Sequence, residues 1–311
     1  MIDEDGPIIQ RVWAEQNQRH ETRIQIIKDI EKKLDRPVVV FYTSFHFPVS
    51  IEDTDADMLE SLLQKLDLSK GLALVINSPG GYGTAAERII NICKKYSGTG
   101  EYWAIVPNRA KSAATMICLG ASKIYMSPTS ELGPVDPIAV VPTEDGRLQR
   151  FSVFHLVQSY KELFEGAIKT NGHLEPYIQQ LSHYDIREIK EYETALELAE
   201  DIAIKALQSC MIPNSNKEEI KQKIKMFLTP KEKKIHERAI YSNEAKSCGL
   251  IIEEIDVKDK LWEMLYELHI RTNNLVSNLA SVSVESADYS FARAPPDPSN
   301  LDMENKQNGR K

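Results

Sequence analysis

Hydrophobic side chains follow two different periods along the first half of the chain. Four short runs rich in β-branched, leucine and aromatic residues are typical of buried strands, and they lie at residues 38–42, 72–76, 102–106 and 123–126. Between these runs, apolar side chains recur every three or four residues, as on one face of a helix, at residues 55–66, 84–96 and 112–119. Strands and helices that alternate through short connections form parallel sheets with right-handed crossovers. The pattern therefore predicts an α/β fold with a mostly parallel sheet.

The segments that flank this sheet differ from it in composition. Residues 12–34 are rich in charged and amide side chains with isoleucines at helical spacing, so we expect an N-terminal helix packed on the core and a first unit over residues 1–36. The main domain is predicted over residues 37–260, with a helical extension at residues 150–210. Residues 281–311 are polar, contain prolines and have no period, which predicts a disordered tail.

The charge balance and the cysteines narrow the class of protein. Lys and Arg number 38 against 46 Asp and Glu, a net charge of −8, whereas general nucleic-acid and anionic-membrane binders need a dominant basic surface. No apolar run approaches the roughly 18–20 residues of a membrane span, and the acidic start MIDEDGPIIQ does not resemble a secretory signal. The four cysteines form no CxxC pair, which favours buried thiols in a reducing compartment. We expect a cytoplasmic protein with no metal site and no transmembrane segment.

Two short segments place reactive groups after predicted strands, where open α/β sheets bind their ligands. The first is NSPGG, in which Gly80 and Gly81 permit a sharp turn whose bare N–H groups can stabilise an oxyanion. The second is AKSAAT, in which Ser112 stands among small residues where a helix begins. A serine there either caps the helix, at about 1 kcal/mol, or acts as a nucleophile.

The order of these segments resembles a known family. VINSPGG is followed after about thirty residues by AKSAAT, then by KIYMSPTSELGPVDP, and later by HERAIYSNEAK with Gly249–Leu250 shortly after it. This order resembles the ClpP-like serine peptidases of the crotonase superfamily, which include signal peptide peptidase A, and it is most similar to the serine dehydrogenase proteinase family. The resemblance runs from about residue 20 to residue 255. It implies a ClpP/crotonase-like fold, acyl-enzyme chemistry on a peptide or protein substrate, and no cofactor.

The resemblance assigns the nucleophile and the oxyanion hole directly. It makes Ser112 the nucleophile and gives the N–H groups of Gly81 and Ala113 to the oxyanion hole, with Gly80 shaping the turn. Clp-type enzymes carry a histidine about 25 residues after the serine, where this chain has Asp136 and no histidine. The general base therefore has to come from elsewhere in the chain.

His236 is the predicted base, with Asp136 or Glu237 to orient its ring. Signal-peptide-peptidase-type enzymes use a lysine instead, and Lys161 or Lys169 would then be the base. Lys111 adjoins the serine, but neighbours on a helix diverge by about 100° and seldom face each other. His155 and His183 are further alternatives, each also compatible with a structural role.

Two other function classes fit the same fold. A crotonase-type acyl-CoA enzyme would hold a thioester enolate in the oxyanion hole, with Glu87 or Glu131 near the reacting carbon, and would leave Ser112 without a role. A non-catalytic scaffold would keep the fold and lack the base. The chain has no Walker-type motif and no GxGxxG fingerprint, so an unfolding ATPase would be a separate partner and a dinucleotide is not expected.

The helical extension offers a surface for association. Apolar side chains between residues 189 and 206 recur at alternating steps of three and four, a seam that fits packing on the domain itself or a contact between subunits. Members of this fold commonly associate through such extensions, so we expect a homo-oligomer.

Overall fold

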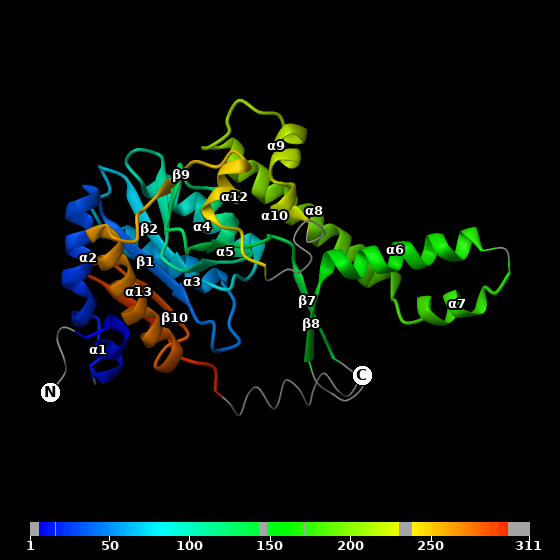
Figure 1. Cartoon of the computed structure of the whole chain (residues 1–311), viewed down its shortest axis with the longest axis horizontal. Coiled ribbons are helices and arrows are strands. Elements are labelled where there is room, and N and C mark those ends of the chain that lie inside the picture. The colour runs from blue at the N-terminus through cyan, green and yellow to red at the C-terminus, as the bar shows by residue number, and fades with distance from the viewer. Residues whose placement is uncertain (1–5, 16, 143–147, 171, 230–237, 298–311) are drawn as a thin grey trace.

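A seven-stranded sheet forms the centre of the molecule (Figure 1). The computed structural model describes residues 6–15, 17–142, 148–170, 172–229 and 238–297. In spatial order the strands are β11 (Ser290–Arg293), β10 (Val282–Glu285), β1 (Val38–Thr43), β2 (Leu72–Asn77), β3 (Tyr102–Val106), β5 (Lys123–Met126) and β9 (Ile252–Glu254). The run from β1 to β9 is parallel, and β10 and β11 extend it antiparallel. The four predicted strands thus share one mostly parallel sheet, which confirms the predicted fold class.

Helices cover both faces of the sheet, which explains why its strands are continuous hydrophobic runs. Successive side chains of a strand point to opposite faces, so Val39 and Phe41 join one core while Val38 and Val40 join the other. The first core is closed by α3 (Asp53–Leu63), α4 (Gly83–Tyr96), α5 (Ala113–Leu119) and part of α8 (Ile186–Gln208). The second is closed by α2 (Glu21–Leu34) and α13 (Lys260–Asn278), and α1 (Ile8–Ala14) packs on α13.

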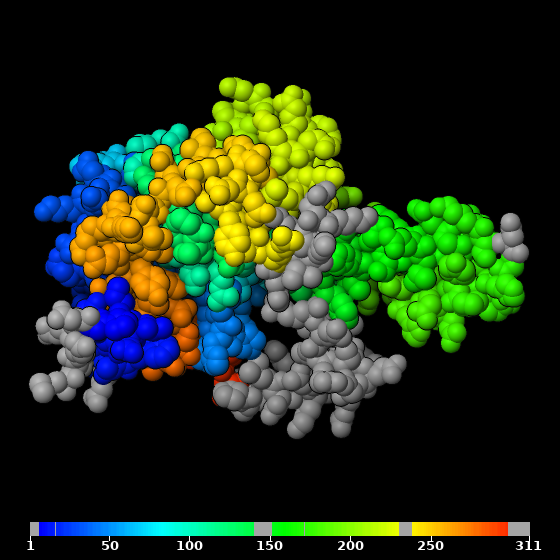
Figure 2. Space-filling view, viewed as in Figure 1, coloured from blue at the N-terminus to red at the C-terminus, as the bar shows by residue number. Residues whose placement is uncertain are grey.

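The predicted helical extension projects to one side of this body (Figures 1 and 2). It consists of the hairpin β7 (Ile138–Pro142) and β8 (Leu148–Ser152), followed by α6 (Val153–Lys169), α7 (Glu175–Leu181) and the first half of α8. The predicted seam lies along α8 and packs inside the chain: Tyr192 and Leu196 contact the β7 and α6 side, and Ala199 and Ala203 join the main core. The remaining short elements are β4 (Arg109–Ala110), β6 (Glu131–Leu132), α9 (Lys217–Lys223), α10 (Lys225–Leu228) and α12 (Ser242–Ser247).

Within the described ranges, no helix has both the length and the apolar character needed to span a membrane. The one helix expected over residues 12–34 is divided into α1 and α2.

The prediction of a disordered tail from residue 281 is wrong for its first part. Residues 282–285 form β10, which pairs with β1 and is buried along its whole length, and residues 290–293 form β11. Residues 298–311 lie outside the described residues. The segment reads as polar because its strand buries Ser283 and Glu285, and the Glu285 carboxylate needs a partner from a distant part of the fold.

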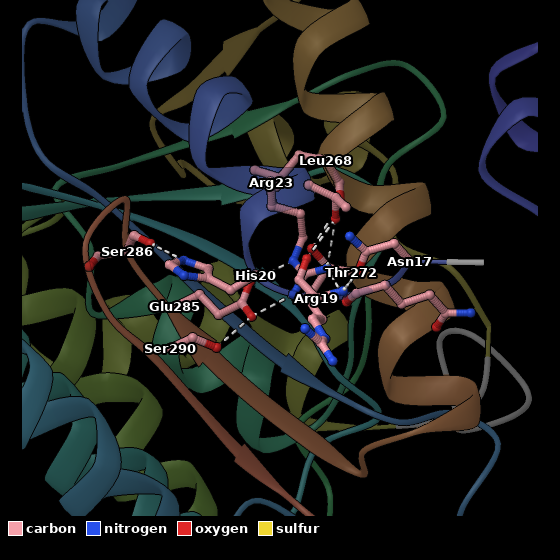
Figure 3. Close-up of polar contacts among 11 residues, drawn as sticks. Asn17, Arg19, His20, Arg23, Leu268, Thr272, Glu285, Ser286 and Ser290 are labelled. Carbon is pink, nitrogen blue, oxygen red and sulfur yellow. Dashed lines mark hydrogen bonds and ion pairs between the residues drawn. The ribbon is translucent and has the colours of Figure 1, made fainter. Parts of the chain in front are cut away.

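The partner of Glu285 is Arg23 on α2 (Figure 3). Arg23 Nε and Nη2 donate to the two carboxylate oxygens at 2.6 and 2.7 Å, and the two side chains are 1% and 0% exposed. Ser290 Oγ donates to Glu285 Oε1 at 2.8 Å, and His20 Nε2 is 2.7 Å from the carbonyl oxygen of Ser286. These contacts attach the start of α2 to the β10–β11 hairpin. The two parallel bonds between Arg23 and Glu285 are charge-assisted, which makes them stronger than bonds between neutral groups.

Candidate active site

Ser112 stands at the turn between β4 and α5 in a strained backbone conformation. Its φ and ψ are 50° and −120°, a combination that an L-residue adopts at a cost of about 1–3 kcal/mol. Its hydroxyl does not cap α5, so the capping role considered from sequence is absent, and among the described residues no group hydrogen-bonds to that hydroxyl. A half-buried serine on a strained strand-to-helix turn is the geometry of an exposed nucleophile.

Hydrogen bonds on both sides hold this turn in place. Ser78, directly after the end of β2, forms a parallel bridge with Ala110, two residues before the serine. Thr115 Oγ1 donates to the carbonyl oxygen of Ala110 at 2.7 Å and accepts from the N–H of Gly133 at 3.1 Å. Thr115 therefore joins the serine turn to the GPVDP segment, and both of the motifs noted in the sequence meet at Ser112.

The glycine pair lies directly against the serine turn. Gly80 has φ +107°, and a Cβ on it would lie 2.7 Å from the Cβ of Ser112 and 3.1 Å from the backbone nitrogen of Ala113. A Cβ on Gly81 would lie 2.1 Å from the backbone nitrogen of Ile51. No side chain fits at either position, so the tandem glycines of the sequence are required by close approach on both sides.

Two backbone N–H groups next to the serine are left without acceptors among the described residues. Ile51 N donates to the carbonyl oxygen of Gly80 at 2.9 Å, and Tyr82 N donates to that of Ile51 at 3.0 Å. These bonds use the groups on either side of Gly81 and leave its own N–H unused. The N–H of Ala113 is also unused, so both donors expected for an oxyanion hole lack an acceptor within the described structure: one directly follows Ser112, and the other directly follows Gly80, which lies against it.

The structure describes Asp136, the predicted partner of the base, but not the predicted base His236. His236 and Glu237 lie outside the described residues. Asp136 is 1% exposed, and its Oδ2 accepts a hydrogen bond from Ser152 Oγ at 2.7 Å. It lines a cavity of about 300 Å³ between α6, α8, α9 and α10. Asp136 follows Gly133 by three residues, so an extended chain would put it at most about 11 Å from the residue that contacts the serine turn.

The Lys111 side chain binds both residues of β6. Its ammonium group lies 2.8 Å from Glu131 Oε2 and donates to the carbonyl oxygen of Leu132 at 3.1 Å. The expectation that Lys111 is not the base agrees with these contacts. They also commit the carboxylate of Glu131, one of the two glutamates considered for acyl-CoA chemistry, to an ion pair.

The other candidate bases lie in the extension. Lys161 pairs with Glu193 at 2.9 Å, and Lys169 pairs with a glutamate one turn earlier at 3.0 Å while remaining 74% exposed. His155 and His183 are also exposed. None of these four side chains has a described contact with the Ser112 turn.

Burial changes the acidity of several groups that the sequence offers as nucleophiles or bases. It raises the pKa of the Cys93 thiol to about 12 and also raises that of Cys118, so neither is a thiolate near neutral pH. Burial, and secondarily the charge of Arg109, lowers the pKa of His269 to about 4. The neutral His269 ring lies between the Tyr42 hydroxyl and the Asn108 amide, at 3.2 and 3.3 Å. The described residues contain no group of three or more side chains placed to bind a metal ion.

Some residues that build the site were not identified from the sequence. Thr115 lies in the AKSAAT motif and Gly133 begins the GPVDP segment, so these motifs were the signal that could have identified both residues. The sequence carries no signal that identifies Ile51, because a single apolar residue after a loop is common in proteins.

One protein-family model matches the part of the chain that contains both motifs. Residues 8–145 match the model of the ClpP-like SDH-type serine proteinases. The resemblance drawn from the motifs is confirmed over this segment, which contains Ser112, both glycines and Asp136. The mixed α/β fold with its mostly parallel sheet is consistent with that family.

Individual relatives add little to the family match. An uncharacterized protein of Methanocaldococcus jannaschii is 32% identical over 125 residues, which are 37% of this chain and 42% of that protein. The aligned part of the chain thus spans less than half of this curated relative. A solved structure of 1510-N, a membrane-bound stomatin-specific protease with a serine-to-alanine substitution, is 14% identical with a TM-score of 0.34, covering 68% of this chain and 76% of its own.

Proposed function

We propose that this protein is a serine peptidase that works through an acyl-enzyme on Ser112. The observation that carries the proposal is the strained Ser112 turn packed against a bare glycine pair, with the N–H groups of Gly81 and Ala113 unused beside it. The match of residues 8–145 to a serine proteinase family supports the same reaction class.

The chemistry follows from these groups in two steps. The Ser112 oxygen attacks the substrate carbonyl carbon while its proton passes to the general base, and the resulting oxyanion accepts hydrogen bonds from Gly81 and Ala113. The C–N bond then breaks, the amine leaves with the proton from the base, and an acyl-serine ester remains. Water then gives a proton to the base and attacks this ester, which forms a second tetrahedral intermediate whose oxyanion accepts hydrogen bonds from the same two N–H groups. Its collapse breaks the bond to Ser112, releases the carboxylic acid and returns the proton to the serine oxygen.

His236 is the base in this proposal, with Asp136 or Glu237 to orient it. The buried position of Asp136, on the segment that leaves Gly133, supports its part in such a pair. The lysine alternative predicts instead that Lys161→Met or Lys169→Met is inactive while His236→Gln retains full activity. Measuring the three variants on one substrate decides between the two bases.

An active-site-directed fluorophosphonate tests the nucleophile directly. We expect the probe to form one covalent adduct, which peptide mass spectrometry places on Ser112, and we expect Ser112→Ala to abolish it. The matched control is Ser61→Ala, which removes an exposed hydroxyl from α3 and should label like the parent. An unlabelled parent protein, or a Ser112→Ala variant that labels fully, would contradict the proposal and favour the acyl-CoA enzyme or the scaffold.

We also propose that the protein is cytoplasmic and works as a homo-oligomer. Large apolar side chains stay exposed on the extension, where α6, α7 and α8 project from the body (Figure 2): Phe164 at 48%, Ile168 at 70%, Ile178 at 57% and Ile186 at 60%. Contact with a second copy would remove such surface from water. Light scattering at micromolar concentration should give a multiple of 35.3 kDa, and the monomer mass would contradict the proposal.

A further inference from the structure

The position of the Gly81 N–H depends on the segment that runs alongside it. Ile51 forms a parallel bridge with Gly81, and its N–H and C=O bind the residues before and after that glycine. Ile51 is fully buried, and its backbone nitrogen touches the place where a Cβ of Gly81 would be. A shift of Ile51 would therefore move the Gly81 N–H, since the glycine has no side chain of its own to anchor it.

Arg293, at the end of β11, binds the chain on both sides of Ile51. Its Nη2 donates to the carbonyl oxygen of Ser50 at 3.1 Å and lies 3.5 Å from Asp55 Oδ2. Its Nη1 lies 2.9 Å from Glu52 Oε2. One guanidinium group thus holds the residue before Ile51, the residue after it and the first turn of α3, as its fixed fork of donors allows.

The carboxylates that face Arg293 also define the start of α3. Glu52 and Asp55 form a reciprocal capping box, in which the Glu52 N–H donates to Asp55 Oδ2 at 2.9 Å. Asp55 is fully buried, and among the described residues Arg293 is the one cation that contacts its side chain. Loss of Arg293 would leave this buried carboxylate without a cation beside the segment that carries Ile51.

The strand that carries Arg293 is itself firmly attached. Ser281 N donates to the carbonyl oxygen of Arg293 at 2.7 Å, and Ser44 N donates to that of Ser281 at 2.9 Å. The loop from residue 44 to residue 52 is therefore fastened to the C-terminal hairpin at both of its ends. The hairpin in turn is fixed to α2 through Glu285 and Arg23 (Figure 3).

We propose that Arg293 is a positioning residue for the oxyanion hole, which it acts on through Ser50, Ile51 and Gly81. The inference rests on the proposed function, because it gives Arg293 a part in the step in which the Gly81 N–H binds the oxyanion. Supports of this kind decide activity because donors must be placed before the reaction, and a displacement of about 1 Å can cost on the order of 10²-fold in rate.

Arg88, on α4, provides a matched control because it binds the same helix, α3, as Arg293 does. It also binds the acidic start of α3, through ion pairs with Asp53, Asp57 and Glu60, but it contacts neither Ser50 nor Asp55. These pairs are largely exposed, and such pairs contribute little. Arg88→Met therefore removes one positive charge from the neighbourhood without releasing Ile51.

The first readout is the rate at which a fluorophosphonate labels Ser112, since its phosphoryl oxygen occupies the oxyanion hole. We expect Arg293→Met to lower the maximal labelling rate about tenfold, a part of the 10²–10³ that a lost donor costs, with the half-saturating probe concentration unchanged. Arg293→Lys, which keeps the charge but not the fork of donors, should regain only part of that rate, and Arg88→Met should label within about twofold of the parent.

The second readout does not depend on activity. Amide hydrogen exchange at Ile51 and Tyr82, whose N–H groups form the bonds around Gly81, should quicken about tenfold in Arg293→Met and stay unchanged in Arg88→Met. Glu52→Gln, which weakens one arm of the clamp, should change exchange in the same direction and covers the case in which Arg293→Met does not fold.

The outcomes separate the two proposals. A parent protein that is not labelled at Ser112 contradicts the serine peptidase, and the exchange measurement alone then judges Arg293. Labelling and exchange that are unaltered in Arg293→Met, or altered equally in Arg88→Met, overturn the positioning role while leaving the peptidase intact.

Discussion

The strained backbone of Ser112 predicts that glycine at this position stabilises the protein while alanine does not. At φ 50° and ψ −120° the Cβ of the residue causes the strain, and glycine has none. Relief of about 1–3 kcal/mol is offset by about 0.4–1 kcal/mol, because glycine loses more conformational freedom on folding. We expect Ser112→Gly to raise the free energy of unfolding by about 1 kcal/mol. Ser112→Ala keeps the strain and loses no hydrogen bond within the described structure, so it should stay within about 0.5 kcal/mol of the parent.

Urea unfolding of matched variants measures this difference. The control pair is Ser61→Gly and Ser61→Ala on the exposed face of α3, where the backbone is helical and glycine should be less stable than alanine by about 1 kcal/mol. The order of glycine and alanine should thus reverse between the two positions. Both Ser112 variants should also lose fluorophosphonate labelling, so that in Ser112→Gly stability rises as activity disappears.

One result would refute the argument about strain. If glycine is less stable than alanine at Ser112 by the same amount as at Ser61, the serine does not occupy the left-handed side of the backbone map in solution. The nucleophile turn would then need another explanation.

Two further predictions concern buried charge. Burial raises the pKa of Asp55 from 3.8 to about 6, so the folded protein binds its proton more tightly than the unfolded chain does. The group's contribution to stability is therefore greatest below about pH 4, falls by about 3 kcal/mol as the pH rises through about 6, and is constant above about pH 7. Urea titrations from pH 4 to 7 should show a shallower fall in Asp55→Asn, and identical slopes would contradict the shift. Arg23→Met should lower the free energy of unfolding by about 3–5 kcal/mol because it leaves the Glu285 carboxylate buried and unpaired, and adding Glu285→Gln should recover part of that loss. A double variant as unstable as the sum of the two single variants would show that the two side chains do not interact.

The sheet could be predicted from the sequence because its information is local. The four predicted strands lie between helices that cover both faces of the sheet, so a short hydrophobic run such as Val38–Val40 is sufficient to identify one of them. The antiparallel strands were missed for the opposite reason. Ser283 and Glu285 read as tail residues, and the arginine that makes Glu285 burial possible lies 262 positions earlier.

The two turns of the candidate active site could be predicted as far as their glycines and serine identify them. Two bare glycines at a strand end and a serine among alanines leave a recognisable pattern, because each residue is constrained by close approach of backbone. The strained φ of Ser112 could not be read from its type, since serine is common in ordinary caps. The sequence constrains the base least, because a histidine or lysine that acts through tertiary contact has no fixed distance from the serine in sequence, and His236 stays a prediction.

The proposed support of the oxyanion hole comes from a part of the chain outside the family match. The Ser112 turn, both glycines and Ile51 fall inside the segment matched by the serine proteinase family, residues 8–145. Arg293 and the hairpin that carries it lie beyond that segment, and Arg293 reaches Ser50 across 243 positions of sequence. On the proposed function, the matched segment supplies the reacting groups, while the precision of their placement depends on a strand outside that segment. Replacing the β10–β11 hairpin with that of a related chain should then alter the rate at which a fluorophosphonate labels an unchanged Ser112. In this proposal the hairpin sets the position of Ile51 and, through it, that of the Gly81 N–H.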